Sequence, residues 1–143
     1  MSDPFELDRF VEAQDAGGTY ERVLDELRRG RKRSHWMWFV FPQVAGLGQS
    51  PTSRHFAVRS LDEARAYLTH DVLGPRLRAS TQALTTLDLR DPVPVFGPVD
   101  AMKLRSSMTL FALADPGEAV FRAVLDQYFD GVEDAATVDL VRV

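Results

Sequence analysis

The chain has 143 residues, of which 45% are hydrophobic and 27% are charged, a composition typical of a globular domain and not of a disordered chain. Its formal net charge of −4 disfavours binding to nucleic acid or to an anionic membrane surface. The absence of cysteine excludes disulfides, iron–sulfur clusters, Cys-ligated zinc and thiol catalysis, and it fits a reducing compartment.

No segment has the pattern of a targeting signal or a membrane span. The residues from Met1 to Asp15 mix acidic and apolar positions and lack the basic-then-apolar order of a signal peptide. The longest run of large apolar side chains, Trp36–Phe41, is far shorter than the ~20 residues that cross a bilayer. We therefore expect a cytoplasmic protein that does not contact a membrane.

Helix-start signals recur through the first half of the chain. Asp3-Pro4 predicts the start of a first helix, with a capping side chain followed by a proline at the first helical position. Thr19 predicts the N-cap of a second helix, and Gly30 predicts its left-handed end. Ser60 and Glu63 form a capping box that predicts a third helix.

The second half continues this pattern. Asp71 predicts the start of a fourth helix, and Leu89–Pro98 predicts a single turn followed by a break at its glycine. Asp115–Glu118 repeats the opening signature of the first helix and precedes a helix that ends at Gly131. Asp134 predicts the cap of a last, short helix.

The remaining stretches complete the predicted fold. Gly46–Ser53 is predicted to be a loop because it is rich in glycine, serine and proline. Asp100–Phe111 is predicted to be a helix with an apolar face, and Trp36–Phe41 a buried helix or an extended core segment that ends at Pro42. We therefore predict an all-α fold: a single compact domain over residues 1–143, with about six to eight helices and one buried aromatic-rich segment.

A cationic run extends from Arg28 to His35 and holds five Lys or Arg side chains in six positions. Such a run attracts phosphate, but Arg28 and Arg29 are better explained by a solvated helix end, where cations complement the dipole. Lys32, Arg33 and His35 adjoin the aromatic segment, where an unpaired buried charge is costly. For these three residues, ligand binding and a solvated surface remain equally open.

The aromatic segment contains Trp36 and Trp38, which could stack on a base or a nicotinamide, although core packing explains them better. Gln43 ends the segment, and its amide is well placed to contact the edge of a ligand.

A second polar cluster lies on the helix predicted over Asp100–Phe111. Lys103, Ser106 and Ser107 are three and four residues apart and share one face, and Arg105 adds a second cation. This pattern fits an anion-binding site, a Ser–Lys nucleophilic pair, or a surface of small residues against which another helix packs. All three interpretations remain open at this point.

The sequence predicts no metal site and no cofactor. His35, His55 and His70 lie in three separate segments, and none has an i, i+4 partner of the kind that binds zinc. The sequence contains no Walker A motif, no GxGxxG and no GxSxG.

Several motifs together resemble the signature of the bacterial domain-of-unknown-function family 1810, over Phe5 to about Leu140. They are the run Gly30–Gln43, then Gly46-Leu47-Gly48, Ser53, Ala64–Leu68, Val72–Leu77 and Lys103–Phe111. The resemblance implies a mainly α-helical single domain and brings no established activity. The chain departs from the family pattern at Phe56, where relatives are expected to carry tyrosine, so no role for a hydroxyl is expected there.

The leading hypothesis is a pocket between Lys32–Gln43 and Lys103–Phe111 that binds an anionic, phosphate-bearing small molecule, such as a nucleotide or an ADP-ribose-like metabolite. A second hypothesis is a hydrolase or transferase that acts on such a ligand with His35 as general base. A third is an interaction module whose basic loop docks an acidic protein or RNA, with nucleic acid ranked last because the chain is acidic. Whether the protein is an enzyme stays open.

Overall fold

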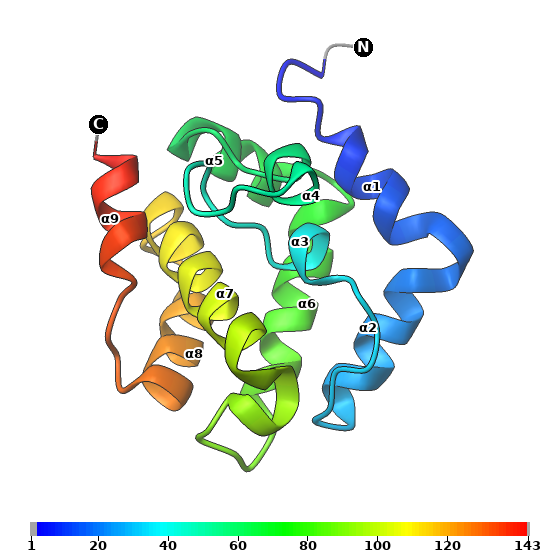
Figure 1. The fold of residues 1–143 in the computed structure, drawn as a ribbon, viewed down its shortest axis with the longest axis vertical. Coiled ribbons are helices and arrows are strands. Elements are labelled where there is room, and N and C mark those ends of the chain that lie inside the picture. Colours follow the sequence, from blue (N-terminus) through cyan, green and yellow to red (C-terminus); the bar gives the residue numbers. More distant parts are fainter. Residues whose placement is uncertain (1–2, 143) are drawn as a thin grey trace.

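The structure, a computed structural model, describes residues 3–142 as a set of helices joined by loops (Figure 1). The helices are α1 (Asp8–Asp15), α2 (Thr19–Arg28), α3 (Met37–Val40), α4 (Pro51–His55), α5 (Leu61–Thr69), α6 (Leu73–Thr85), α7 (Val93–Ala114), α8 (Ala119–Phe129) and α9 (Ala135–Val141). A 3-10 turn, Ala16–Gly18, joins α1 to α2. Within residues 3–142 the β-type pairing is limited to an isolated parallel bridge between Val44 and Val58, so the all-α prediction is confirmed.

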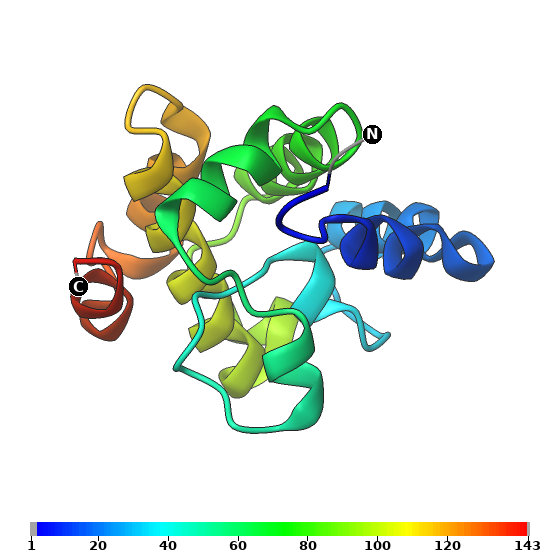
Figure 2. The ribbon, with the colours of Figure 1, turned by 90° about the horizontal axis from the view of Figure 1, so that it is seen from above.

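Helix α7 lies at the centre of the molecule, because it packs against α5, α8 and α9. Figure 2 shows α1 and α2 on one side of α7, with α8 and α9 on the other. The chain between α3 and α5 forms the lower edge of that view. The buried apolar side chains form one continuous core, whose largest fully buried members are Trp36, Tyr67, Phe10, Phe41, Phe111 and Phe121.

Local capping signals predicted several helix boundaries correctly. The Ser60 hydroxyl accepts from the Glu63 N–H at the start of α5, and an Asp134 carboxylate oxygen accepts from the Thr137 N–H at the start of α9. Gly30 adopts φ +74° after α2, as a left-handed helix end requires. These predictions held because the donor and the acceptor of a cap lie within three or four residues of each other.

Three predicted helix starts are wrong in detail. Helix α1 begins at Asp8 and not at Pro4, although the Asp3 carboxylate still caps it by accepting from Leu7 N and Asp8 N at 2.8 and 3.1 Å. Helix α2 has Gly18 and not Thr19 at its N-cap, since the Thr19 hydroxyl donates instead to the Ala16 carbonyl.

The start of α6 also differs from the prediction, which placed it at Asp71. His70 caps this helix: its Nδ1 accepts from the N–H groups of Val72 and Leu73 at 3.1 and 3.2 Å. An imidazole nitrogen can replace a carboxylate here because the α6 N–H groups need only an acceptor lone pair.

Of the predictions for the irregular stretches, two are confirmed and one is wrong. The aromatic segment forms the short helix α3 and is largely buried, and the predicted break at Gly97 occurs as a non-helical residue with φ +80° inside α7. The stretch predicted as a loop, Gly46–Ser53, contains the start of α4, which the sequence analysis missed. The missed signal is Ser50-Pro51, where the serine hydroxyl caps the helix and the proline occupies its first turn.

No helix in the described part of the chain combines the length and the apolar character that a membrane span requires.

Candidate ligand-binding pocket

The pocket is built by two segments on either side of α4. Gln43–Ala45 and Ala57–Arg59 run side by side, because Val58 N donates to the Gln43 carbonyl at 2.9 Å and Ala45 N donates to the Val58 carbonyl at 2.8 Å. The intervening residues fold back as α4, which is capped by Ser50. This arrangement brings Ser53 and Arg54 of α4 into one pocket with Trp38 and Gln43.

Gly48 permits the close approach of the loop to α4. A Cβ atom at this position would lie 2.5 Å from both Cβ and Oγ of Ser53, closer than non-bonded atoms approach. The Ser53 hydroxyl is itself held by the hydroxyl of Ser50, which donates to it at 2.9 Å. Glycine is therefore needed here so that the loop can pack against Ser53.

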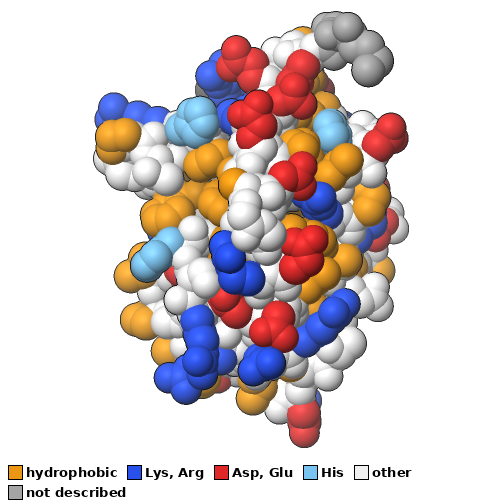
Figure 3. All heavy atoms as spheres, turned by 90° about the vertical axis from the view of Figure 1, so that its right-hand side faces the viewer, with side chains coloured by type: hydrophobic (Ala, Val, Ile, Leu, Met, Phe, Trp, Pro, Cys, Tyr) orange, Lys and Arg blue, Asp and Glu red, His pale blue; other side chains and the backbone are white. Residues whose placement is uncertain are grey.

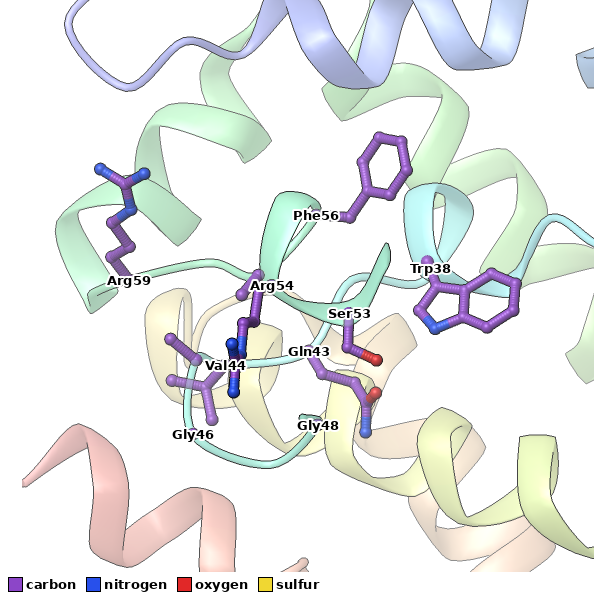
Figure 4. Close-up of a pocket in the computed structure, with 11 residues that line it drawn as sticks. Trp38, Gln43, Val44, Gly46, Gly48, Ser53, Arg54, Phe56 and Arg59 are labelled. Atoms are coloured by element: carbon purple, nitrogen blue, oxygen red, sulfur yellow. The ribbon is translucent and has the colours of Figure 1, made fainter. Parts of the chain in front are cut away.

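The pocket has a volume of about 110 Å³ (Figure 4). Figure 4 shows the indole nitrogen of Trp38, the hydroxyl of Ser53 and the amide of Gln43 directed toward a common region, whereas the Arg59 guanidinium points away from it. The other lining residues are Val44, Ala45, Gly46, Gly48, Arg54, Phe56 and Ala57.

The electrostatic character of this pocket is unusual for an acidic chain. Its lining contains two arginines, Arg54 and Arg59, and no aspartate or glutamate. Four other depressions on the described surface each include at least one carboxylate side chain. The lining thus offers hydrogen-bond donors and positive charge without a competing carboxylate.

The indole N–H of Trp38 is buried and has no hydrogen-bond partner within the described residues. A tryptophan nitrogen can only donate, and a buried donor left unpaired costs about 1–3 kcal/mol. The indole of Trp36 behaves differently, because its N–H donates to Glu26 Oε1 at 2.9 Å. The Trp38 N–H is therefore a donor of the pocket lining that has no acceptor within residues 3–142.

A cluster of charged and aromatic side chains lies beside Trp38. The chain contains only two lysines, and both pair with Asp100: Lys32 Nζ at 3.0 Å and Lys103 Nζ at 3.5 Å. Each lysine also lies over an indole ring, Lys32 over Trp36 at 5.1 Å and Lys103 over Trp38 at 4.4 Å. Two ammonium groups thus share one carboxylate, and the cluster beside Trp38 carries one more positive charge than negative charge.

Glu26 organises the cationic run that leads into this cluster. Its carboxylate accepts hydrogen bonds from Arg33 N, Ser34 N, the Ser34 hydroxyl and the Trp36 indole, at 2.6 to 3.0 Å. Burial alone would raise the pKa of Glu26, but these four donors outweigh burial and lower the pKa from 4.5 to about 2. The carboxylate therefore stays ionised and ties the loop after α2 to the start of the aromatic segment.

The structure brings the two predicted stretches into contact. Trp38 and Gln43 line the pocket, while Lys32, Trp36 and Lys103 form the adjacent cluster. The cavity itself lies within residues 38–59 and does not include Lys103–Phe111 in its lining.

The other predicted site residues lie elsewhere. Arg33 and His35 are exposed, and Arg105 donates to the carbonyls of Val132 and Glu133. Ser106 contacts Asp134 and the Met102 carbonyl. Ser107 is fully buried on the same helix face as Lys103, and its hydroxyl has no partner within residues 3–142.

Three polar residues of the pocket lining, Ser53, Arg54 and Arg59, are absent from the predicted site residues. In the sequence, Gly46, Gly48 and Ser53 indicate only a loop and a part of the family signature. The capping pattern of Ser50 and Pro51 is the signal that would have placed Ser53 and Arg54 together on a helix. The described residues contain no group of three or more His, Asp or Glu side chains suited to hold a metal ion.

The family model described as "Protein of unknown function (DUF1810)" matches residues 4–141. The chain belongs to the DUF1810 family. This DUF1810 protein is also similar to a solved structure, that of the conserved hypothetical protein Rv1873 from Mycobacterium tuberculosis, with 52% sequence identity and a TM-score of 0.95 over 99% of each chain. No protein of curated function matches the chain.

Proposed function

We propose that this DUF1810 protein binds a small anionic, phosphate-bearing molecule in the pocket formed by Trp38, Gln43, Ser53 and Arg54. The observation that carries the proposal is the buried N–H of Trp38, which has no partner within residues 3–142 and lies in a pocket lined by Arg54 and by no carboxylate. An anionic oxygen would satisfy this donor and would also gain from the surrounding positive charge.

The pocket volume limits which part of a ligand enters. A cavity of about 110 Å³ is smaller than the roughly 150 Å³ engineered cavity that holds benzene, and far below the ~300–1,000 Å³ of pockets that enclose a drug-sized ligand. A phosphate group fits these dimensions. A nucleotide or an ADP-ribose-like metabolite would place its phosphate inside and leave the base and the ribose at the mouth.

The side chains of the pocket have two different roles in the proposed binding. The Trp38 indole, the Ser53 hydroxyl and the Gln43 amide are neutral donors that would contact the phosphate oxygens directly. The Arg54 guanidinium, which now donates to Gln49 at 3.3 Å, supplies charge at the mouth. Trp36 has no part in binding, because it is fully buried and donates to Glu26.

Binding can be tested by titration calorimetry and thermal unfolding with inorganic phosphate, AMP, ADP-ribose and, as a control anion, acetate. A ligand present at 100 times its Kd should stabilise the protein by about 2.7 kcal/mol. Trp38→Phe removes the N–H but keeps an aromatic ring under Lys103. A hydrogen bond to a charged group contributes about 1.5–3 kcal/mol, so this variant should bind the ligand at least tenfold more weakly.

Arg54→Gln should also weaken binding, whereas the matched substitution Arg90→Gln, at an exposed arginine outside the pocket, should not. If none of the phosphate-bearing compounds binds, or if Trp38→Phe binds as tightly as the wild type, the proposal is wrong.

A further inference from the structure

A second cationic surface lies on α2 and the loop that follows it, away from the phosphate pocket. Arg22, Arg29, Arg31 and Arg33, here called the arginine face, surround a depression of about 320 Å³ together with Asp25 and Glu26. Figure 3 looks onto the side of the molecule formed by α1 and α2 and shows Lys and Arg side chains gathered over its lower half.

In the loop after α2, Lys32 points into the protein, whereas its neighbours lie on this surface. Lys32 points inward: its N–H donates to the Val95 carbonyl at 2.8 Å, and its ammonium, in a side chain only 9% exposed, pairs with Asp100. The neighbours Arg31 and Arg33 are both exposed. This alternation of exposed and inward side chains is typical of an extended segment, in which residues i and i+2 lie on the same side, about 7 Å apart.

Neither acidic residue of the depression forms an ion pair with Arg22, Arg31 or Arg33. Glu26 is 7% exposed, and its carboxylate already accepts four hydrogen bonds from the interior of the loop. Asp25 pairs with Arg29 at 3.1 Å. Arg22 donates only to neutral oxygens, and neither Arg31 nor Arg33 has an ion pair within residues 3–142. Three guanidinium groups are therefore available to an external anion.

The loop is also held in place before any partner arrives. Glu26 binds the backbone N–H of Arg33, the Glu26 carbonyl accepts from Arg31 N at 3.0 Å, and Lys32 is anchored on both its N–H and its ammonium. A partner would therefore have to order little more than the arginine side chains themselves, and such preorganisation lowers the entropic cost of binding.

We infer that the arginine face binds an extended, acidic segment of another protein. Arginine holds carboxylates through paired N–H groups, and alternate acidic residues of an extended peptide repeat at about the spacing of Arg31 and Arg33. The residues that line the depression include no aromatic ring on which a base could stack, and the net charge of −4 repels a long polyanion. These two features favour a short acidic peptide over RNA.

The experiment measures fluorescence anisotropy of a labelled peptide of alternating glutamate and serine, with the same peptide carrying glutamine as the negative control. The acidic peptide should bind and the glutamine peptide should not, and binding should weaken as salt is raised. The double variant R31Q/R33Q should lose at least tenfold in affinity.

The matched control is R90Q/R142Q, which removes the same charge at exposed arginines outside this face and should change affinity less than twofold. If both double variants lose the same affinity for the peptide, net charge alone explains the binding and the inference is wrong. It is also wrong if the acidic peptide does not bind to the wild type. Tighter binding of a labelled single-stranded RNA through Arg31 and Arg33 would overturn the choice of partner. Trp38→Phe should leave peptide binding unchanged, so this test is independent of the phosphate pocket.

Discussion

Replacing Glu26 by glutamine is expected to destabilise the protein strongly at neutral pH and progressively less as the pH falls. The folded-state pKa of Glu26 is about 2, against an ordinary value of 4.5, and at about 1.4 kcal/mol per unit this difference corresponds to about 3 kcal/mol of stability. The depressed pKa sets the sign: the contribution is fully present above pH 4.5 and is lost as the pH falls through about 2.

Urea unfolding of the wild type and Glu26→Gln at pH 7, 5, 4 and 3 measures this contribution as the difference between the two proteins, which cancels the titration of all other carboxylates. We expect a difference of about 3 kcal/mol at pH 7 that falls to roughly half at pH 3. The adjacent Asp25, in an exposed pair with Arg29, is the matched control, and Asp25→Asn should cost less than about 1 kcal/mol at every pH. A Glu26→Gln difference that does not vary with pH would refute the reasoning.

Three further substitutions test the fold by urea unfolding at neutral pH. His70→Ala removes the acceptor at the start of α6 and should cost about 1 kcal/mol, and an unchanged midpoint would show that water replaces the cap. Gly74→Ala should cost about 2–3 kcal/mol, because its Cβ would lie 2.2 Å from the Leu68 carbonyl oxygen, and a neutral result would contradict this packing. Asp130→Gly relieves a left-handed residue with φ +54° and should stabilise by about 1 kcal/mol, so a loss of stability would show that the aspartate side chain matters there.

The local features of this fold could be predicted from the sequence because their partners lie close together along the chain. Ser60 and Glu63, Asp134 and Thr137, and the left-handed Gly30 are all explained within a few residues. The corrections at α1 and α6 arise where more than one nearby residue could serve as the cap. The choice of His70 over Asp71 depended on the path of the incoming chain, which the sequence pattern does not specify.

The candidate site was predicted only in part. The sequence predicts Trp38 and Gln43 as candidate ligand-binding residues, and both line the pocket. Their partners Ser53 and Arg54 come from a short helix in a stretch that was predicted to be a loop, and the backbone pairing of Val44 with Val58 brings them together. Pairing between segments so far apart in the chain leaves no periodic trace in the sequence, so pattern reasoning could not find it.

The sequence by itself determined that this chain is all-α, where helices such as α5 and α9 begin, and that its two lysines and two tryptophans lie in two polar–aromatic stretches. Only the tertiary structure decided that both lysines share Asp100 and that one indole N–H is bonded to Glu26 while the other is left unpaired in a cavity. Periodicity and capping depend on neighbours within one or two turns, whereas the pairing of a buried charge or donor depends on which distant side chain the folded core brings within about 3 Å.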